Sequence, residues 1–316
     1  MEKTPENKPS VVSIGEIMIE LSGIQADGAA KIGFAGDTAN TAIYLSRLFR
    51  DNGRVGYLSR LGQGDFSEKL ASALSNENVE VSPASHALPG TPGLYAITTD
   101  DEGERSFTYW RESAPVRQLF EGAPAPDERM FASEFDCLYI SGITLAVLSD
   151  AGRSTILELA KRFVAGGKQV MFDVNFRPHL WKSHSPDADV PAIVREMIAT
   201  STILKIGRDE GEWLFGIAAS ADLIADLNSL GEATLVVTDG ADRVYVDEQG
   251  QLHEVSFNVV EKVIDSTAAG DSFSAGYLHA ALSGKGAVEA VKAGQKLAAC
   301  VIQHPGAIIP LSEMPK

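Results

Sequence analysis

The residues best suited to chemistry lie in the stretch DSTAAGDSFSAGYL, at positions 265–278. Most of its side chains are small, and Asp265 and Asp271 are its only charged residues. Small residues let a ligand approach the backbone closely, and the free N–H groups at the start of a helix attract anions such as phosphate. With a helix beginning near Gly270, Asp271 could accept a proton from a hydroxyl group that attacks the phosphate. Alternatively, Asp271 is a first-turn acid that only complements the helix dipole.

Two arginines could hold an anionic ligand. Arg111 follows two β-rich runs, GLYAITTDDEGERSFTYW at 93–110, and Arg177 follows the strand-like run QVMFDV at 169–174. The chain carries a net charge of −16, so an anionic substrate needs fixed cations to overcome the repulsion. A guanidinium group can pair with both oxygens of a carboxylate. Alternatively, each arginine is a solvated surface charge.

These residues must be positioned by a fold in which strand-like and helix-like segments alternate. Apolar residues recur at helical spacing in 37–49 and 150–165, whereas FDCLYISGI (135–143) and QVMFDV are short apolar runs typical of buried strands. The alternation predicts βαβ units, and therefore an α/β fold with a mainly parallel sheet. The two β-rich runs at 93–110 break this pattern around the polar turn 100–104 and predict a hairpin that could cover an active site.

The composition is that of a globular protein, with 44% hydrophobic and 22% charged residues among 316. The longest apolar runs are too short to span a membrane, and the chain does not open on a secretory signal, so we expect a cytoplasmic protein. The acidic net charge argues against nucleic-acid binding. Cys137 and Cys300 lie in apolar contexts that suggest buried thiols in a reducing compartment. The six histidines show no spacing typical of metal ligands.

The stretch at 265–278 resembles the C-terminal signature of the ribokinase-like (PfkB) carbohydrate kinases. The resemblance covers nearly the whole chain, although FAGDTANTA matches the N-terminal signature only approximately, with Thr38 where Gly, Ala or Pro is usual. It implies a ribokinase-like three-layer α/β fold with a mainly parallel central sheet and a small β lid. The implied organisation is a disordered tail at 1–10 and a single kinase domain at 11–316, with lid segments at about 17–36 and 88–112.

The same resemblance implies the roles of individual residues. The implied catalytic residues are Ala268, Ala269, Gly270, Asp271 and Arg177. The positions from Ala268 to Asp271 would form an anion hole with Asp271 as the base, and Arg177 would lie near the reacting groups. Four stretches, GDTANTAIYLSRL, GLYAITTDDEGERSFTYWRESAP, DVNFRPHLW and DSTAAGDSFSAGYL, are most similar to the family's 2-keto-3-deoxygluconate kinases. This implies that Mg·ATP phosphorylates the C6 hydroxyl group of that sugar acid. The implied substrate-binding residues are Gly36, Asp37, Asn40, Tyr95, Tyr109, Arg111, Arg177 and Asp271.

Two other functions stay open. Fructose or another ketose is an alternative acceptor, because fructokinases share the pattern NxRPxLW. A sugar-sensing or nucleotide-sensing protein without turnover is a second alternative. Tyr95 and Tyr109 could also be packing residues of the lid. Lid strands of this family often pair between subunits, which allows a homodimer or a higher homo-oligomer.

The resemblance also implies an ATP-binding site, in which this sequence departs from the family pattern at two positions. The ATP-binding residues would be Lys205, Thr238, Asp239, Gly240, Gly270, Gln295 and Gly306. Many relatives have Lys in place of Thr238, and Asn in place of Gly207. Glu210 could act on Mg²⁺ through water or could lie on a surface helix. Asp265 and Thr267 could contribute oxygens to a monovalent cation such as K⁺.

Overall fold

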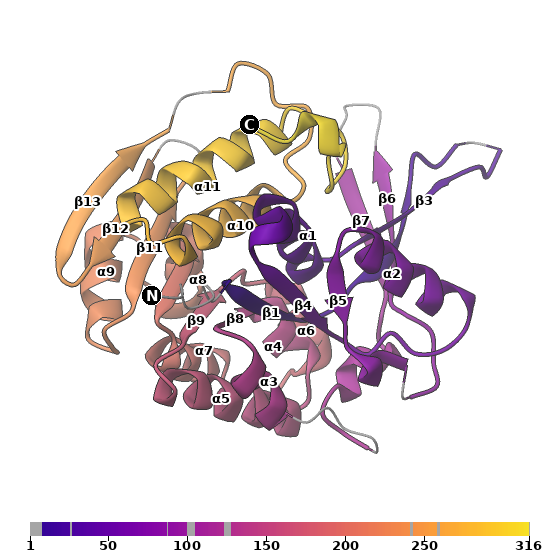
Figure 1. Ribbon diagram of the computed structural model, residues 1–316, viewed down its shortest axis with the longest axis horizontal. Helices are drawn as coiled ribbons and strands as arrows, with labels where there is room; N and C mark the ends of the chain where they lie inside the picture. Colours follow the sequence, from indigo (N-terminus) through magenta and orange to yellow (C-terminus); the bar gives the residue numbers. More distant parts are fainter. Residues whose placement is uncertain are drawn as a thin grey trace, which may run out of the picture.

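The computed structural model describes residues 8–25, 27–86, 88–99, 105–122, 128–240, 243–257 and 260–315. Within these ranges the chain forms one large sheet covered by helices on both faces and one small sheet at its side (Figure 1). No helix in these ranges is both long and apolar enough to cross a membrane.

The large sheet is mainly parallel, as predicted. Its strands, in spatial order, are β13 (Gln251–Ser256), β12 (Arg243–Glu248), β11 (Thr234–Asp239), β10 (Ile203–Gly207), β9 (Gln169–Asp173), β8 (Cys137–Ser141), β1 (Ser10–Ile14), β4 (Arg54–Leu58) and β5 (Val79–Val81). The strands from β11 to β5 pair in parallel, and β12 and β13 add an antiparallel edge. Strands β1 and β8 are buried along their whole length, which is typical of a parallel sheet covered on both faces.

Helices form a layer on each face of this sheet, so the predicted three-layer architecture is confirmed. One face carries α1 (Asp37–Phe49), α2 (Asp65–Asn76), α10 (Ala269–Leu282) and α11 (Ala287–Val301). The other carries α3 (Glu128–Glu134), α4 (Gly142–Val147), α5 (Asp150–Ala165), α6 (Pro178–His184), α7 (Val190–Thr200), α8 (Arg208–Phe215) and α9 (Ser220–Asn228). Short 3₁₀ turns are η1 (Arg50–Asn52), η2 (Pro83–His86), η3 (Pro115–Gln118) and η4 (Leu311–Glu313). Successive residues Val11 and Val12 of β1 enter the two different cores, because side chains alternate along a strand.

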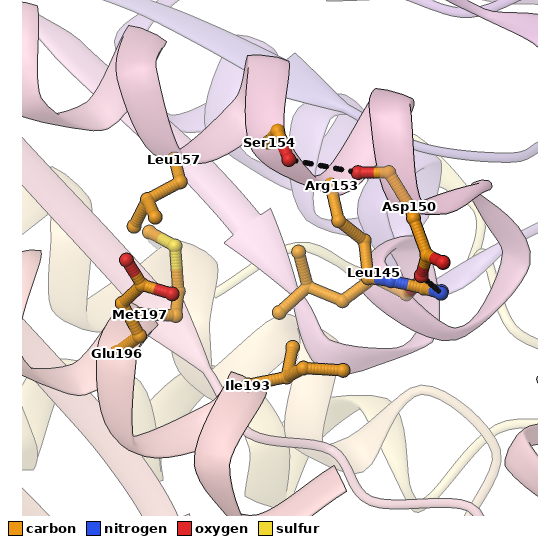
Figure 2. A pocket seen from close by; sticks show the side chains of 8 residues that line it. All are labelled: Leu145, Asp150, Arg153, Ser154, Leu157, Ile193, Glu196 and Met197. Carbon is orange, nitrogen blue, oxygen red and sulfur yellow. Dashed lines mark hydrogen bonds and ion pairs between the residues drawn. The ribbon is translucent and has the colours of Figure 1, made fainter. Parts of the chain in front are cut away.

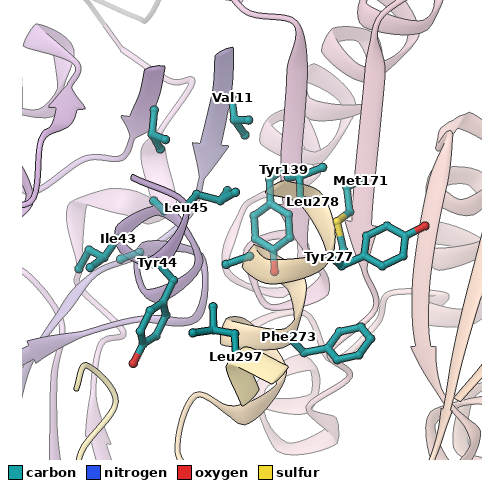
Figure 3. Close-up of a cluster of buried hydrophobic side chains, with 14 of the residues drawn as sticks. Val11, Ile43, Tyr44, Leu45, Tyr139, Met171, Phe273, Tyr277, Leu278 and Leu297 are labelled. Carbon is teal, nitrogen blue, oxygen red and sulfur yellow. The ribbon is translucent and has the colours of Figure 1, made fainter. Parts of the chain in front are cut away.

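The two C-terminal helices pack unusually closely. A Cβ atom on Gly276 of α10 would lie 2.8 Å from the Ala293 carbonyl oxygen, and one on Gly294 of α11 would lie 2.7 Å from the Phe273 carbonyl oxygen. Figure 3 shows Phe273 and Leu278 of α10 within the core formed with α1 and the strands. Gly276, within the small-residue stretch, therefore serves helix packing and not the close approach of phosphate.

The small sheet has the strand order β3 (Lys31–Ala35), β2 (Met18–Ser22), β6 (Leu94–Thr99) and β7 (Arg105–Trp110). Strands β6 and β7 pair antiparallel, which is the pairing expected for the two β-rich runs. The predicted turn at 100–104 lies outside the described residues.

Ser10 is not part of a disordered tail, so the predicted tail at 1–10 is wrong at this residue. Ser10 already belongs to β1, because its N–H and hydroxyl groups both donate to the Asp136 carboxylate and hold it on the sheet. Residues 1–7 lie outside the described part of the chain.

Candidate active site

A polar cavity of about 420 Å³ lies at the carboxyl ends of the central strands. Strand β1 pairs with β4 on one side and with β8 on the other, so the chain order reverses there, and ligands of open α/β sheets bind at such a switch point. Among the described residues, four acidic and three basic side chains line it: Glu16, Asp37, Asp173, Asp271, Arg111, Arg177 and Lys205.

Asp271 lies in the first turn of α10 and faces this cavity. The Asn40 side-chain amide donates to Asp271 Oδ2 at 2.8 Å, and the Thr41 hydroxyl donates to the Asp271 carbonyl oxygen at 3.2 Å. Burial, and then the nearby charge of Asp37, raise the pKa of Asp271 to about 7. A carboxylate with that pKa can hold a proton taken from a hydroxyl group near neutral pH. Asn40, predicted as a substrate ligand, therefore also orients Asp271.

The predicted anion hole borders the cavity at the N-terminus of α10. Ala268 is the N-cap and has φ +60°, a left-handed conformation that usually favours glycine. The N–H group of Ala269 donates to the Ser266 carbonyl oxygen at 3.2 Å, so this predicted donor is already engaged locally. The remaining N–H groups of the first turn have no carbonyl groups of an earlier helical turn to bond, which leaves them suited to an anion.

Lys205 lies where two cavities meet. Its ammonium group donates to Asp173 Oδ2 at 2.6 Å, and the Ser274 hydroxyl donates to the same oxygen at 3.0 Å. A Cβ atom on Gly270 would lie 3.4 Å from Lys205 Nζ, so the glycine keeps the space beside the ammonium group open. Lys205 is therefore a fixed, largely buried cation next to the start of α10.

The two predicted anchoring arginines differ in their environment. Arg111 is only 6% exposed, and its guanidinium group pairs with the buried carboxylate of Glu16. It is not the solvated charge that was the alternative interpretation. Arg177 is exposed at the cavity wall, donates to the Phe176 carbonyl oxygen at 3.1 Å, and forms no ion pair within the described ranges.

The N-terminus of α1 forms a further wall of the cavity. A Cβ atom on Gly36 would lie 2.0 Å from the Glu16 carbonyl oxygen, so only glycine fits there. The Asn175 side-chain amide donates to Asp37 Oδ2 at 3.1 Å and orients it. Burial raises the pKa of Asp37, and the side-chain hydrogen bond with Ser141 lowers it.

The inner face of the small sheet presents aromatic side chains to the cavity. Tyr95 is buried and its hydroxyl group donates to Glu20, whereas Tyr109 is 45% exposed. The two rings lie 5.8 Å apart, and Phe107 stacks 6.4 Å from Tyr109. Tyr95 therefore packs within the sheet as well as bordering the cavity, and both interpretations of this residue are compatible with its position.

A second, apolar cavity of about 480 Å³ adjoins the first. The predicted residues Thr238 and Gly240 line it at the end of β11. Its other lining residues are mostly apolar: Phe257, Val260, Val263, Phe273, Ala298, Ala299 and Ile302. It shares Lys205, Ser266, Ala269 and Gly270 with the polar cavity. A flat apolar ligand group and an anionic group could thus lie in one continuous path toward Asp271.

Other predicted nucleotide residues do not line the apolar cavity. Asp239 accepts hydrogen bonds from Arg208 at 2.9 Å and from Ser220 at 3.3 Å. Gln295 lies on α11 beside a different surface cavity. The N–H group of Gly306 donates to Asp265 Oδ2 at 2.7 Å and so links two loops.

The two tentative metal positions have local roles. Both oxygens of Glu210 accept backbone N–H groups at 2.6 Å, from Phe176 and from Gly207, which caps α8. Glu210 is half-buried and both of its oxygens are hydrogen-bonded, so it is not a freely solvated residue of a surface helix, and burial raises its pKa. Asp265 Oδ1 accepts the N–H group of Thr267 at 2.9 Å. The predicted cation contacts at these residues stay predictions.

Several residues of the site were not predicted from sequence. Glu16, Asp173 and Asn175 all line the polar cavity. Each follows or ends a buried strand-like run, and that position at the carboxyl end of a parallel strand was the signal available for them. The apolar cavity had no such signal, because Phe257, Val260 and Val263 lie outside regular secondary structure.

Thr38, the departure in the N-terminal signature, is accommodated by its neighbours. Its side chain is fully buried, and its hydroxyl group lies 3.1 Å from that of Tyr57. A Cβ atom on Gly15 would lie 2.2 Å from Thr38 Oγ1, so Gly15 provides the space that the larger residue needs.

A separate cavity of about 160 Å³ lies between α4, α5 and α7 (Figure 2). It is lined by Leu145, Leu157, Ile193 and Met197 with a few polar residues. The Arg153 guanidinium beside it donates to two backbone carbonyl oxygens, to Ser185 and to Asp150. Arg153 therefore holds the ends of helices together, and this cavity contains none of the predicted site residues.

Comparison with known proteins identifies related sequences over almost the whole chain. The family model described as pfkB family carbohydrate kinase matches residues 8–314. A protein of Dickeya dadantii (strain 3937) named 2-dehydro-3-deoxygluconokinase is 39% identical over 310 residues, covering 97% of this chain and 98% of the relative. A protein of Escherichia coli (strain K12) with the same name is 40% identical over 309 residues, covering 96% of this chain and 98% of the relative.

Among solved structures, a PfkB protein from Polaromonas sp. JS666 is similar, with a TM-score of 0.78 and 26% sequence identity. The match covers 93% of this chain and 96% of that one. The likeness in fold and the likeness in sequence therefore point to the same family.

Proposed function

The chain belongs to the pfkB family of carbohydrate kinases, and we propose that it transfers the γ-phosphoryl group of Mg·ATP to the C6 hydroxyl group of 2-keto-3-deoxygluconate. One observation carries the proposal: the Asp271 carboxylate lines the charged cavity directly after Gly270, and Gly270 and Lys205 line both that cavity and the apolar one. The names of the two relatives at 39% and 40% identity support the choice of acceptor.

The reaction requires a base, and Asp271 supplies it. When the acceptor hydroxyl group attacks the γ-phosphorus atom, the proton moves to Asp271, and the bond from phosphorus to the leaving oxygen breaks. A pKa of about 7 allows Asp271 to be ionised before the reaction and to hold the proton after it. The Asn40 amide keeps the carboxylate directed toward the cavity.

Negative charge that develops during transfer would be stabilised at the start of α10. The N–H groups around Gly270 and the ammonium group of Lys205 are fixed before the substrates arrive, so little reorganisation is needed. Mg²⁺ arrives with ATP and offsets the charge of its phosphates. Glu210, whose two oxygens each accept a backbone N–H group, would act on that ion through water, since Mg²⁺ usually keeps several of its waters.

The acid group of the acceptor would be held by the arginines. Arg177 offers an exposed cation at the wall of the polar cavity, and Arg111 offers a buried, fixed guanidinium group. We propose that the small sheet acts as the lid over the acceptor, with Tyr95 and Tyr109 on its inner face. Closing such a lid would exclude water, which competes as a phosphoryl acceptor.

The test is ADP release from Mg·ATP with 2-keto-3-deoxygluconate, its galactonate epimer and fructose. We expect turnover of the keto-deoxy acid, and we expect Arg177→Gln to raise its KM about 10- to 100-fold, the loss typical of one charge-assisted hydrogen bond. Arg162→Gln, an exposed arginine on α5, is the matched control and should leave KM unchanged. Turnover of fructose alone would indicate a ketose kinase. Ligand-induced thermal stabilisation without ADP release would indicate a sensing protein.

We also propose that copies of the chain associate through the small sheet. Its edge strands β3 and β7 expose Ile32 (53%) and Trp110 (55%). Sedimentation should show a dimer or higher oligomer that Trp110→Lys weakens, and a monomer at all concentrations would contradict this.

The free thiols of Cys137 and Cys300 support a cytoplasmic location.

A further inference from the structure

A buried ion pair joins the two sheets at the wall of the polar cavity. Glu16 follows β1 of the large sheet, and Arg111 follows β7 of the small sheet. The side chains are 4% and 6% exposed, and Arg111 Nη2 donates to Glu16 Oε2. Both residues line the polar cavity. The ion pair therefore links the loop after β1 of the large sheet to the end of β7 of the small sheet.

The hydrogen bonding of this ion pair is incomplete, so the pair is not explained by a contribution to stability alone. Within the described ranges, Glu16 Oε1 and Arg111 Nε are buried without any hydrogen-bond partner. A buried ion pair offsets the loss of its hydration only when its remaining donors and acceptors are satisfied. An unsatisfied buried group in a native protein calls for another explanation, such as a functional one.

A second ion pair in the same chain shows the contrast. Arg47 is 7% exposed and contacts Glu77 through two nitrogen atoms, each at 2.7 Å from a carboxylate oxygen. Arg47 also donates to the Ile309 carbonyl oxygen at 2.6 Å. That pair is fully engaged and lines none of the cavities described above, so it serves packing. The Glu16–Arg111 pair has fewer bonds and lies at the site.

The surrounding backbone fits the pair closely. A Cβ atom on Gly93 would lie 2.6 Å from Glu16 Oε1 and 3.1 Å from Arg111 Cβ, so a larger residue would displace the carboxylate. Arg111 also lies over the Tyr109 ring, 5.8 Å from its centroid. The guanidinium group is thus held from one side by the carboxylate and from another by an aromatic ring.

Charges facing Glu16 come from several elements. Arg111 is its partner, Arg117 of η3 lowers its pKa further, and Asp37 of α1 raises it. Burial is the largest effect and raises the pKa of Glu16. The paired Arg111 offsets part of this cost, which ties the charge of Glu16 to the position of Arg111.

From this geometry we infer that Glu16 is a positioning residue for the sugar-acid acceptor: its carboxylate fixes the Arg111 guanidinium group so that Arg111 meets the acid or keto end of the acceptor in one orientation. Glu16 acts through Arg111 and does not itself move a proton. The inference rests on the proposed function, because it concerns the same acceptor. It predicts that the affinity for the acceptor depends on Glu16, in the loop after β1, as well as on Arg111, after β7 of the small sheet.

The test is a double-mutant cycle on the full chain, with steady-state KM values measured separately for 2-keto-3-deoxygluconate and for ATP. Glu16→Gln should raise the acceptor KM about tenfold or more, because a small misplacement of a binding group is costly, while kcat and the ATP KM change little. In the background of Arg111→Met, Glu16→Gln should change the acceptor KM by less than about twofold, since its effect passes through Arg111. Glu77→Gln is the matched control, and should lower thermal stability without changing the acceptor KM.

Each other outcome has a clear meaning. An unchanged acceptor KM in Glu16→Gln, or the same increase with and without Arg111, would overturn the inference. If Glu16→Gln does not fold, the Glu16→Asp variant keeps the charge with a shorter reach, and it should show the same selective increase in acceptor KM. If the wild-type chain turns over only a ketose, the proposed acceptor is wrong, and the same cycle measured with that ketose then decides the role of Glu16.

Discussion

The two cavities that meet at Lys205 and Gly270 are lined by side chains of opposite character, charged in one and apolar in the other. The polar cavity has seven charged lining residues and positions nearly all of them by hydrogen bonds across elements, such as Asn40 to Asp271 and Asn175 to Asp37. The apolar cavity is lined mainly by Val, Ala, Phe and Ile side chains, with Thr238 and Lys205 at its edge.

This difference indicates where specificity is set. Oriented charges cannot be rearranged without leaving a buried group unpaired, so we expect the polar cavity to select the acceptor of the proposed reaction. An apolar slot excludes water and accepts a flat group by shape, with less discrimination between similar ligands. The proposed kinase should therefore be strict toward its sugar acid and more tolerant toward the nucleotide base.

The largest expected effect is that of Asp271→Asn. Removing the base should lower kcat about 10²- to 10⁴-fold, which is the usual contribution of general-base catalysis. Single-turnover and steady-state ADP release measure it. Asp247→Asn is a matched control, since Asp247 is also buried and accepts from an Asn amide at 3.0 Å, but lies on β12 outside both cavities. Comparable losses in both variants would show that the carboxylate of Asp271 has no special role.

The same variant should be more stable than the wild type at alkaline pH. The pKa of Asp271 is raised from 3.8 to about 7 in the folded chain, so ionised Asp271 destabilises the fold. This cost is fully present above about pH 7 and disappears as the pH falls toward 4. Urea denaturation should therefore give Asp271→Asn a gain of about 1–3 kcal/mol at pH 8, shrinking at pH 5. A gain that does not depend on pH would contradict the assignment.

The pH dependence of the wild type is the next largest effect. Because the base must be ionised, kcat/KM should be level above about pH 7 and fall about tenfold per unit below it, in line with the pKa of Asp271. A pH–rate profile from pH 5 to 9 tests this. A profile that stays level down to pH 5 would exclude Asp271 as the titrating group.

A change in the apolar cavity should have a smaller and separate effect. Ala299→Leu adds bulk to the wall that α11 contributes, and should raise the KM for ATP by about tenfold through overpacking of the slot. The acceptor KM should not change, because Ala299 does not line the polar cavity. Initial rates at varied ATP and varied acceptor separate the two, and an equal increase in both would break the distinction between the cavities.

The smallest effect is expected at Ala268, which lines the polar cavity at the N-terminus of α10. Ala268 has φ +60°, so Ala268→Gly relieves a left-handed conformation and should raise the free energy of unfolding by up to about 1 kcal/mol. Thermal unfolding measures the change. A destabilised variant would mean that the Ala268 side chain makes packing contacts that outweigh the strain.

Much of the fold was predictable because its signals are local. Alternating apolar runs and helical spacing indicated the parallel sheet, and the β-rich runs around 100–104 indicated the antiparallel pair β6 and β7. The small-residue stretch marked the start of α10 and the one acid in its first turn. These patterns depend on neighbours within a few residues, so they can be followed in the sequence alone.

What the sequence alone determined, then, is the class of fold, the family resemblance and the chemistry available at Asp271, Arg111 and Arg177. Only the tertiary structure decided which arginine is buried and paired, since Glu16 and Arg111 are 95 positions apart and meet across two sheets. It also decided that the Asp239 and Glu210 carboxylates accept local hydrogen bonds, and that the loop residues Phe257, Val260 and Val263 line the apolar cavity. The physical reason is that charge state and burial depend on packing between distant segments, and no local pattern records that packing.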